Sequence, residues 1–208
     1  MELHQFAEIE ADGKSILPPP PSFSRVPSFP LQNDESINPS VEYIGSEIQK
    51  YRENNEISSL VFAGEGEPTL RWKSLNLLAS KLRLDLGDKT KIRLVTNGLI
   101  LSNTNEDRRE LMLNELKSSG IDELSIAFMT SCPEQFDLLM EPVSHEDDEL
   151  KDKQSWHQKL CHTIQDAVKV GFEVECTGVE RQEVDKHATE EMARELGVSS
   201  FRWRPYFP

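Results

Sequence analysis

Cysteine is scarce in this sequence of 208 residues, which contains only Cys132, Cys161 and Cys176. An odd number of cysteines at these wide spacings fits neither a disulfide framework nor a zinc-binding pattern. The positions before Cys132 hold no thiol at all, and we predict no metal site from these side chains. This usage of cysteine is typical of a reducing, cytoplasmic environment.

Long apolar runs and an excess of positive charge are also missing. No stretch approaches the roughly 20 apolar residues that a membrane-spanning helix requires, so we expect no membrane association. The sequence has 23 basic and 37 acidic side chains, a net charge of −14, which disfavours non-specific binding to a nucleic-acid backbone. The N-terminus lacks the basic and apolar segments of a secretory signal, which again favours the cytoplasm.

Proline is concentrated at the start of the chain, where residues 1–39 hold seven of the twelve prolines. Proline removes a backbone donor and biases its neighbours toward extended conformations. This composition predicts a flexible, disordered arm over residues 1–39, followed by a folded domain over residues 40–208. The arm is either a plain linker or an interaction segment for a protein partner.

From residue 40 onward, helical and strand patterns alternate. Helices are predicted over residues 41–51, 72–82, 106–117, 156–168 and 184–196, and strands over 57–63, 91–96, 123–128, 172–176 and 200–204. This order predicts an α/β fold of about five parallel strands with covering helices. Ligands of such folds lie at the carboxyl ends of the strands, which are residues 64–68, 96–98, 128–131, 177–181 and 202–206.

The most informative stretch, residues 61–71, has the sequence VFAGEGEPTLR. Gly64 and Gly66 follow a strand and let the backbone approach a ligand closely, while Glu65 and Glu67 supply acceptors for an ammonium group. The same residues also suit a purely structural turn, in which Pro68 starts a helix and the glutamates lie near its positive end. Both interpretations stay open at this point.

This stretch resembles the Gly-Gly-Glu-Pro motif of the radical SAM superfamily, which binds the amino group of S-adenosylmethionine. Further segments resemble the same superfamily in the same order, namely TNGL at 96–99, IDELSI at 121–126, ECTGV at 175–179, and LGV with FRWRPY at 196–198 and 201–206. The last pair is similar to the TatD-linked radical SAM group. The resemblance covers residues 55–206 and implies a partial (β/α) barrel.

By this resemblance, the methionine end of the cofactor would be held by Gly64, Gly66, Glu67 and Pro68. Thr96 and Asn97 would lie near the same pocket. Arg202 and Arg204 on the last strand are candidates for binding a substrate carboxylate or phosphate. The alternative for these two arginines is simple solvation, because residues two apart share one face of a strand.

The superfamily's Cys-x3-Cys-x2-Cys loop, which ligates a 4Fe-4S cluster, has no counterpart before Val61. Ala63, Ala127 and Met129 also replace residues with more polar or ligating capacity in the TatD-linked group. Ordinary core or loop positions are expected for Cys132, Cys161 and Cys176. The resemblance therefore implies one of two cases. Either the chain is a divergent or truncated member that cannot generate the radical, or its first strand and the loop after it were replaced by the proline-rich arm through a different splice or a faulty gene model.

Three functions remain open. The resemblance implies S-adenosylmethionine binding and, where a 4Fe-4S cluster is present, radical chemistry on an unknown substrate. The alternative is a catalytically inactive binding or scaffold protein derived from a radical SAM barrel. A third interpretation is an α/β hydrolase-like enzyme that uses Glu65 or Glu67 as a base.

Overall fold

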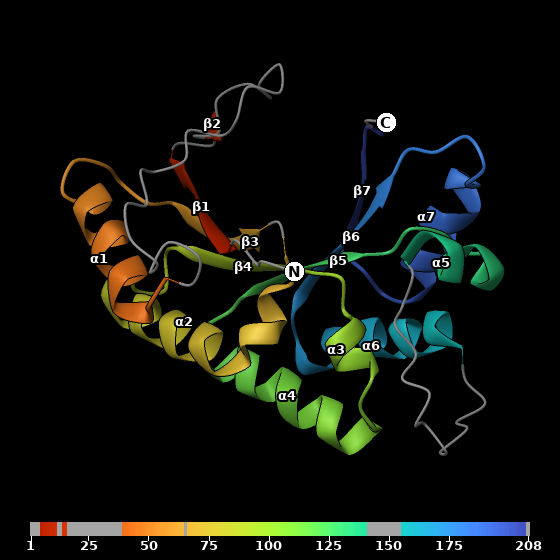
Figure 1. Cartoon of the computed structure of the whole chain (residues 1–208), viewed down its shortest axis with the longest axis horizontal. Helices are drawn as coiled ribbons and strands as arrows, with labels where there is room; N and C mark the ends of the chain where they lie inside the picture. The colour runs from red at the N-terminus through yellow and green to blue at the C-terminus, as the bar shows by residue number, and fades with distance from the viewer. Residues whose placement is uncertain (1–4, 12–13, 16–38, 65, 141–154, 207–208) are drawn as a thin grey trace. The chain divides into compact units, whose positions relative to one another are not determined.

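The structure is a computed structural model that describes residues 5–11, 14–15, 39–64, 66–140 and 155–206. The chain divides into a first unit, Met1–Val95 with Ser118–Asp122, and a second unit, Thr96–Lys117 with Glu123–Pro208. Both units combine parallel strands with covering helices, which confirms the predicted α/β class (Figure 1). Within the described ranges, no helix is both long and apolar enough to cross a lipid bilayer.

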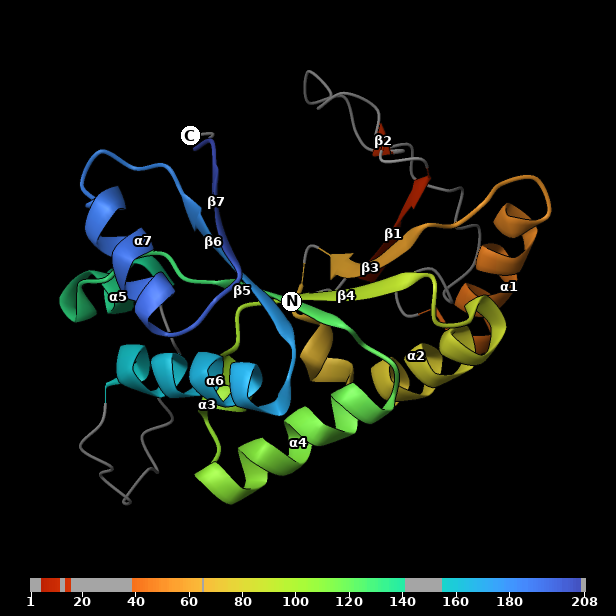
Figure 2. The ribbon, with the colours of Figure 1, turned by 180° about the vertical axis from the view of Figure 1, so that it is seen from behind.

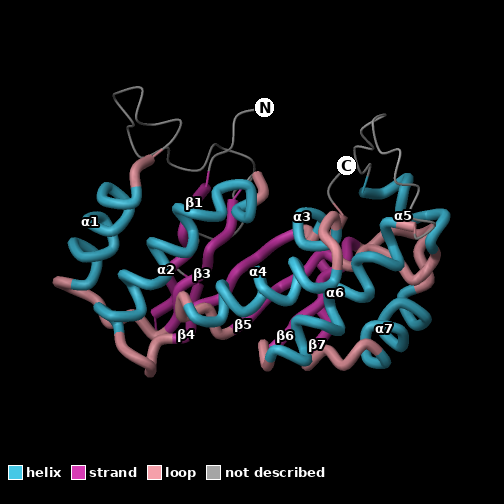
Figure 3. Tube along the Cα trace, turned by 90° about the horizontal axis from the view of Figure 1, so that it is seen from below, coloured by secondary structure: helices cyan, strands magenta, loops and turns pink. Residues whose placement is uncertain are grey.

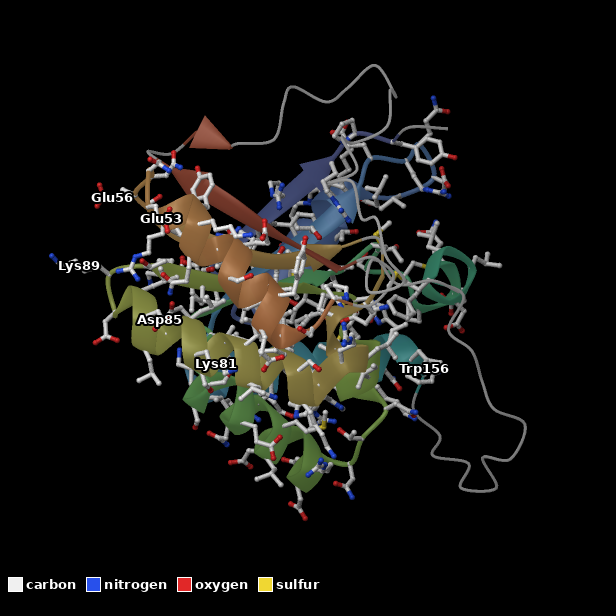
Figure 4. The ribbon with its side chains drawn as sticks, turned by 60° about the vertical axis from the view of Figure 1, so that its left-hand side comes forward. Glu53, Glu56, Lys81, Asp85, Lys89 and Trp156 are labelled. Atoms are coloured by element: carbon white, nitrogen blue, oxygen red, sulfur yellow. The ribbon has the colours of Figure 1, made fainter. Side chains whose placement is uncertain are left out.

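The first unit contains β1 (Gln5–Ala11), β2 (Lys14–Ser15), α1 (Val41–Arg52), β3 (Ser59–Gly64), η2 (Pro68–Arg71), α2 (Trp72–Leu86) and most of β4 (Lys91–Thr96). Strands β3 and β4 are parallel neighbours. Helices α1 and α2 lie side by side (Figure 1). Lys81 and Asp85 of α2 are labelled in Figure 4, and Asp85 Oδ2 accepts a hydrogen bond from Gln49 Nε2 of α1 at 2.9 Å.

Two strands lie inside the predicted N-terminal arm. Strand β1 is antiparallel to β3, in a register that runs from Gln5↔Gly64 to Glu10↔Ser59, and β2 pairs with β1. This corrects the expectation of an irregular arm at residues 5–11 and 14–15. The arm's prolines all lie at position 18 or beyond, so β1 keeps every backbone donor that strand pairing needs. The proline-rich residues 16–38 lie outside the described part of the chain.

The second unit contains α3 (Leu99–Ser102), α4 (Glu106–Ser118), β5 (Glu123–Ala127), α5 (Pro133–Met140), α6 (Trp156–Val170), β6 (Glu173–Val179), α7 (Lys186–Glu195) and β7 (Ser200–Arg204), with Ser118 itself grouped in the first unit. Strands β5, β6 and β7 are parallel and adjacent in that order (Figure 2). Helices α4 and α6 are joined by a buried ion pair between Arg109 and Asp166, with 2.7 Å between Nη2 and Oδ2.

Helices α3 and α5 are absent from the sequence-based expectation. The loop predicted around Cys132 and Pro133 is the beginning of α5, where Pro133 occupies the first helical position. Proline is compatible with that position because the amide there has no intrahelical partner. The helix is anchored by Phe136, whose side chain is fully buried. The acidic residues 141–152 lie outside the described part of the chain.

The guanidinium of Arg83 holds together several segments of the first unit near the connection from α2 to β4. Arg83 donates through Nε and Nη2 to the carbonyl of Gly120, through Nη1 to the carbonyls of Gly87 and Thr90, and through Nη2 to Asp122 Oδ2. These five bonds use every N–H that an arginine side chain possesses. Gly120 has φ of 98°, and a Cβ there would lie 2.7 Å from the Arg83 side chain, so only glycine fits beside this guanidinium.

We expect Arg83→Lys to lower the free energy of unfolding by about 2–4 kcal/mol. An ammonium group has three donors, so at least two of the five charge-assisted bonds are lost. Arg52→Lys in α1 is the matched control, because Arg52 is exposed and its Nη1 donates one bond to the Asp85 carbonyl, which lysine can replace. Urea unfolding of both variants measures the difference, and equal stabilities would contradict the central role of Arg83.

Candidate functional site

The turn after β3 brings together the first group of predicted site residues. Strand β3 ends at Gly64, and Glu67 is the N-cap residue of η2, with Pro68 as its first position. Glu67 Oε1 accepts hydrogen bonds from the Thr69 amide at 3.0 Å and from Thr69 Oγ1 at 2.6 Å. Glu67 is only 9% exposed and Thr69 2%. The turn therefore has the capping geometry of the structural interpretation, and it also holds a carboxylate in a fixed, nearly buried position at a strand end.

A small apolar cavity lies between the start of this turn and the two helices. Its volume is about 30 Å³, and it is lined by Pro39, Val41, Ile44, Phe62, Ala63, Pro68, Arg71, Ser74, Leu75 and Leu78. Small-molecule sites generally measure about 300–1,000 Å³. The cavity is therefore packing space between α1, α2 and β3, and a nucleoside does not fit inside it.

Thr96, the last residue of β4, and Asn97, which follows it, belong to the second unit. The Gly98 amide donates to Thr96 Oγ1 at 3.0 Å, and the Leu99 amide donates to Asn97 Oδ1 at 3.0 Å. Gly98 has φ of 72°, and a Cβ there would lie 2.7 Å from Leu160 Cδ1. The Thr-Asn-Gly segment thus forms a tight turn whose side-chain oxygens bind backbone amides at the start of α3.

Arg202 and Arg204 lie on β7, also in the second unit. Arg202 Nη2 donates to Glu175 Oε1 at 3.0 Å, and the same oxygen accepts a bond from Ser125 Oγ at 3.0 Å. The structure thus brings Thr96, Asn97 and the two arginines into one unit, and Gly64, Gly66, Glu67 and Pro68 into the other. Sequence reasoning missed Ser125 and Glu175, although strand alternation and parallel register are the signals that would have placed them beside Arg202.

The three cysteines do not form the ligand set of an iron–sulfur cluster. Burial raises the pKa of the Cys161 thiol in α6 to about 11 and that of the Cys176 thiol in β6 to about 12. Half-buried Cys132 precedes α5, and its thiol donates to Glu134 Oε2 at 3.1 Å. Among the described residues, no three His, Cys, Asp or Glu side chains are grouped to hold a metal ion. A 4Fe-4S cluster needs thiolates, so these cysteines do not fit it.

His157 of α6 contacts the loop that follows β5 and holds it against the helix. Its side chain is 1% exposed, its ring lies between those of Phe128 and Phe136, and its Nε2 is 3.1 Å from the Thr130 carbonyl oxygen. That contact makes Nε2 the protonated nitrogen of a neutral ring. Desolvation lowers the pKa of His157 below its ordinary value of 6.5, with a smaller opposing effect from the Thr130 hydrogen bond.

Comparisons with known proteins assign no family. No protein-family model matches the chain, and no curated protein has a sequence similar to it.

We expect iodoacetamide to modify Cys132 in the folded protein at least about 100-fold faster than Cys161 or Cys176. Raising a thiol pKa from 9.0 to about 11 lowers its thiolate fraction by about that factor, and burial slows the reaction further. Peptide mass spectrometry over a time course measures the three rates, with guanidinium-unfolded protein as the control in which all react. Fast modification of Cys161 or Cys176 would show that these thiols are accessible to a metal.

The free energy of unfolding should fall as the pH decreases from 6.5 toward the lowered pKa of folded His157. In that interval the unfolded chain binds a proton that the folded chain excludes, so acid favours unfolding, whereas above pH 6.5 the contribution is constant. His157→Gln keeps an N–H for the Thr130 carbonyl but does not titrate. Denaturant unfolding at several pH values should give a shallower pH dependence for this variant, and identical slopes would contradict the assignment.

Proposed function

We propose that this chain is a radical SAM-like protein that binds S-adenosylmethionine at the carboxyl end of β3 and acts as a binding or scaffold protein. The residues that would hold the methionine end are Gly64, Gly66, Glu67 and Pro68. The carboxylate of Glu67 complements the ligand's ammonium group, and the glycines let the backbone approach it. Radical cleavage of S-adenosylmethionine is part of this proposal only if a 4Fe-4S cluster is held by groups other than Cys132, Cys161 and Cys176.

The observation that carries the proposal is the placement of Glu67. This acidic side chain, in the turn after β3, is 9% exposed and is held in place by its two bonds from Thr69. A neutral glutamine would cap η2 equally well through its amide oxygen. A carboxylate can accept a charge-assisted hydrogen bond from a cation, and the ammonium of an amino acid is such a cation.

The chemistry of the cysteines supports binding over catalysis. When bound to a cluster, S-adenosylmethionine supplies a carbon radical by reductive cleavage of a carbon–sulfur bond. Such a cluster needs three thiols, and the chain has three. Two of them, Cys161 in α6 and Cys176 in β6, are buried and have raised pKa values. The side chains of this chain therefore contribute ligand recognition, and their arrangement favours the inactive binding or scaffold alternative.

Glu67→Gln should weaken binding of S-adenosylmethionine at least about tenfold, because it removes the charge that faces the ammonium group. Isothermal titration calorimetry with S-adenosylhomocysteine and 5′-methylthioadenosine separates the contributions. The first ligand keeps the amino acid, and the second lacks it, so 5′-methylthioadenosine should bind weakly and be insensitive to the variant. Glu56→Gln, at an exposed position before β3 (Figure 4), is the matched control and should bind like the original chain.

Equal affinities of the Glu67→Gln and Glu56→Gln variants would contradict the role of Glu67, provided that both unfold at the temperature of the unsubstituted protein. Failure of every ligand to bind would contradict the proposed function as a whole. Anaerobic reconstitution with iron and sulfide tests the catalytic question. Release of 5′-deoxyadenosine by the reconstituted chain would overturn the assignment to binding alone.

A further inference from the structure

The second unit presents a polar sheet face that the proposed function does not use. Residues paired across parallel strands point to the same side, so the register Ser125↔Glu175↔Ser200 places these three side chains on one face. The next row on that face joins Ala127, Thr177 and Arg202. The opposite face carries apolar residues such as Ile126 and Cys176, over which α6 and α7 lie (Figure 3).

Glu175 fixes the guanidinium of Arg202 on this polar face. Its Oε1 accepts from Ser125 Oγ and from Arg202 Nη2, each at 3.0 Å. Ser125 is fully buried, and the side chain of Glu175 is 15% exposed, whereas that of Arg202 is 54% exposed. Arg202 is thus held through Nη2, and the remaining N–H groups of its exposed guanidinium are available to a ligand. Over the part of the chain that the structure describes, no other group binds this guanidinium.

Arg204 lies two residues further along β7 and therefore on the same face, about 6.6 Å away along the strand. Its backbone carbonyl accepts from the Glu180 amide at 2.8 Å, which ties this end of β7 to the end of β6. Its exposed side chain has no partner among residues 5–11, 14–15, 39–64, 66–140 and 155–206. Two arginines whose guanidinium groups have unused donors thus lie on the same face at the carboxyl end of β7.

Trp203 between them holds this arrangement in place. On the opposite face its Nε1 donates to Glu190 Oε1 of α7 at 2.6 Å, and its ring packs against Phe201 with 4.9 Å between centroids. A Cβ on Gly178 would lie 2.5 Å from the Trp203 ring, so the indole packs directly on the backbone of β6. With the tryptophan fixed, both arginines have to point to the other side of the strand.

We propose that Arg202 and Arg204 form a binding site for the oxyanion group, carboxylate or phosphate, of a small molecule. The N–H groups along one edge of a guanidinium can donate to two oxygens of a carboxylate or a phosphate. Two such guanidinium groups bind the anion more strongly than water does. Of the three carboxylates on this face, only Glu175 bonds to Arg202, whereas Glu123 and Glu173 lie one row further from the two arginines. Glu175 is a positioning residue that orients Arg202. The site lies wholly in the second unit and does not depend on ligand binding by Glu67.

The test is a titration of the full chain with inorganic phosphate and, separately, with acetate at constant ionic strength, followed by the ¹⁵N–¹H signals of the arginine Nε groups. We expect saturable shifts of the Arg202 and Arg204 signals. Arg204→Gln should weaken binding of the preferred anion at least about fivefold. Glu175→Gln keeps both hydrogen bonds and removes a repelling charge, so it should tighten binding about threefold. Arg194→Gln on exposed α7 removes an equal charge elsewhere and serves as the control.

Stronger binding of phosphate than of acetate assigns the site to phosphoryl compounds, and the reverse order assigns it to carboxylates. The proposal is wrong if neither anion gives saturable shifts, or if Arg194→Gln weakens binding as much as Arg204→Gln. It is also wrong if Glu175→Gln leaves the affinity unchanged. Melting temperatures of the variants identify any loss that is due to unfolding, and Arg202→Lys provides a milder variant that keeps the positive charge.

Discussion

The arrangement of the first unit depends on satisfying backbone carbonyls where three segments meet. The carbonyls of Gly87 and Thr90, between α2 and β4, and of Gly120, after α4, lie outside the helices and strands and need donors from elsewhere. Arg83 supplies the donors from one side chain, and Asp122 reciprocates by accepting the Ile92 amide through Oδ2 at 2.9 Å. Thr90 extends the network by donating to the Ile57 carbonyl at 3.0 Å. The start of β4 is thereby fixed relative to the start of β3. Both strands begin at this end of the unit, and β3 leads from it to the Glu67 turn.

The strand-end residues that suggest ligand binding also build the turns in which they lie. Glu67, Thr96 and Asn97 each accept a bond from a backbone amide two residues further along the chain. Such bonds satisfy the donors at helix starts, where the helix itself has no acceptor. A structural role and a ligand-binding role are compatible here, because a carboxylate has more acceptor capacity than one cap requires. The proposed site at Glu67 therefore uses a side chain whose position the fold already determines.

Prediction from the sequence succeeded where local pattern and packing agree. Strands at 91–96 and 200–204 have the bounds expected for them, and helix α1 starts at Val41, the first residue expected for it. It failed where the signal was short or distant. Helix α3 has four residues, too few for a periodic pattern, and β6 continues to Val179 because its last residues pair with β7. Strand β1 has no local signature strong enough to identify it, since its pairing with β3 joins residues 49 to 59 positions apart.

The sequence by itself determined the α/β class, the parallel strands and the strand ends at which the candidate residues lie, because periodicity and glycine turns are local properties. It also determined that thiolates for a cluster are missing before Val61. Only the tertiary structure decided which side chains meet. The bonds from Ser125 and Arg202 to Glu175 join three strands, and the five bonds of Arg83 reach segments up to 39 positions away. Such contacts depend on register and burial, which no single stretch of sequence contains.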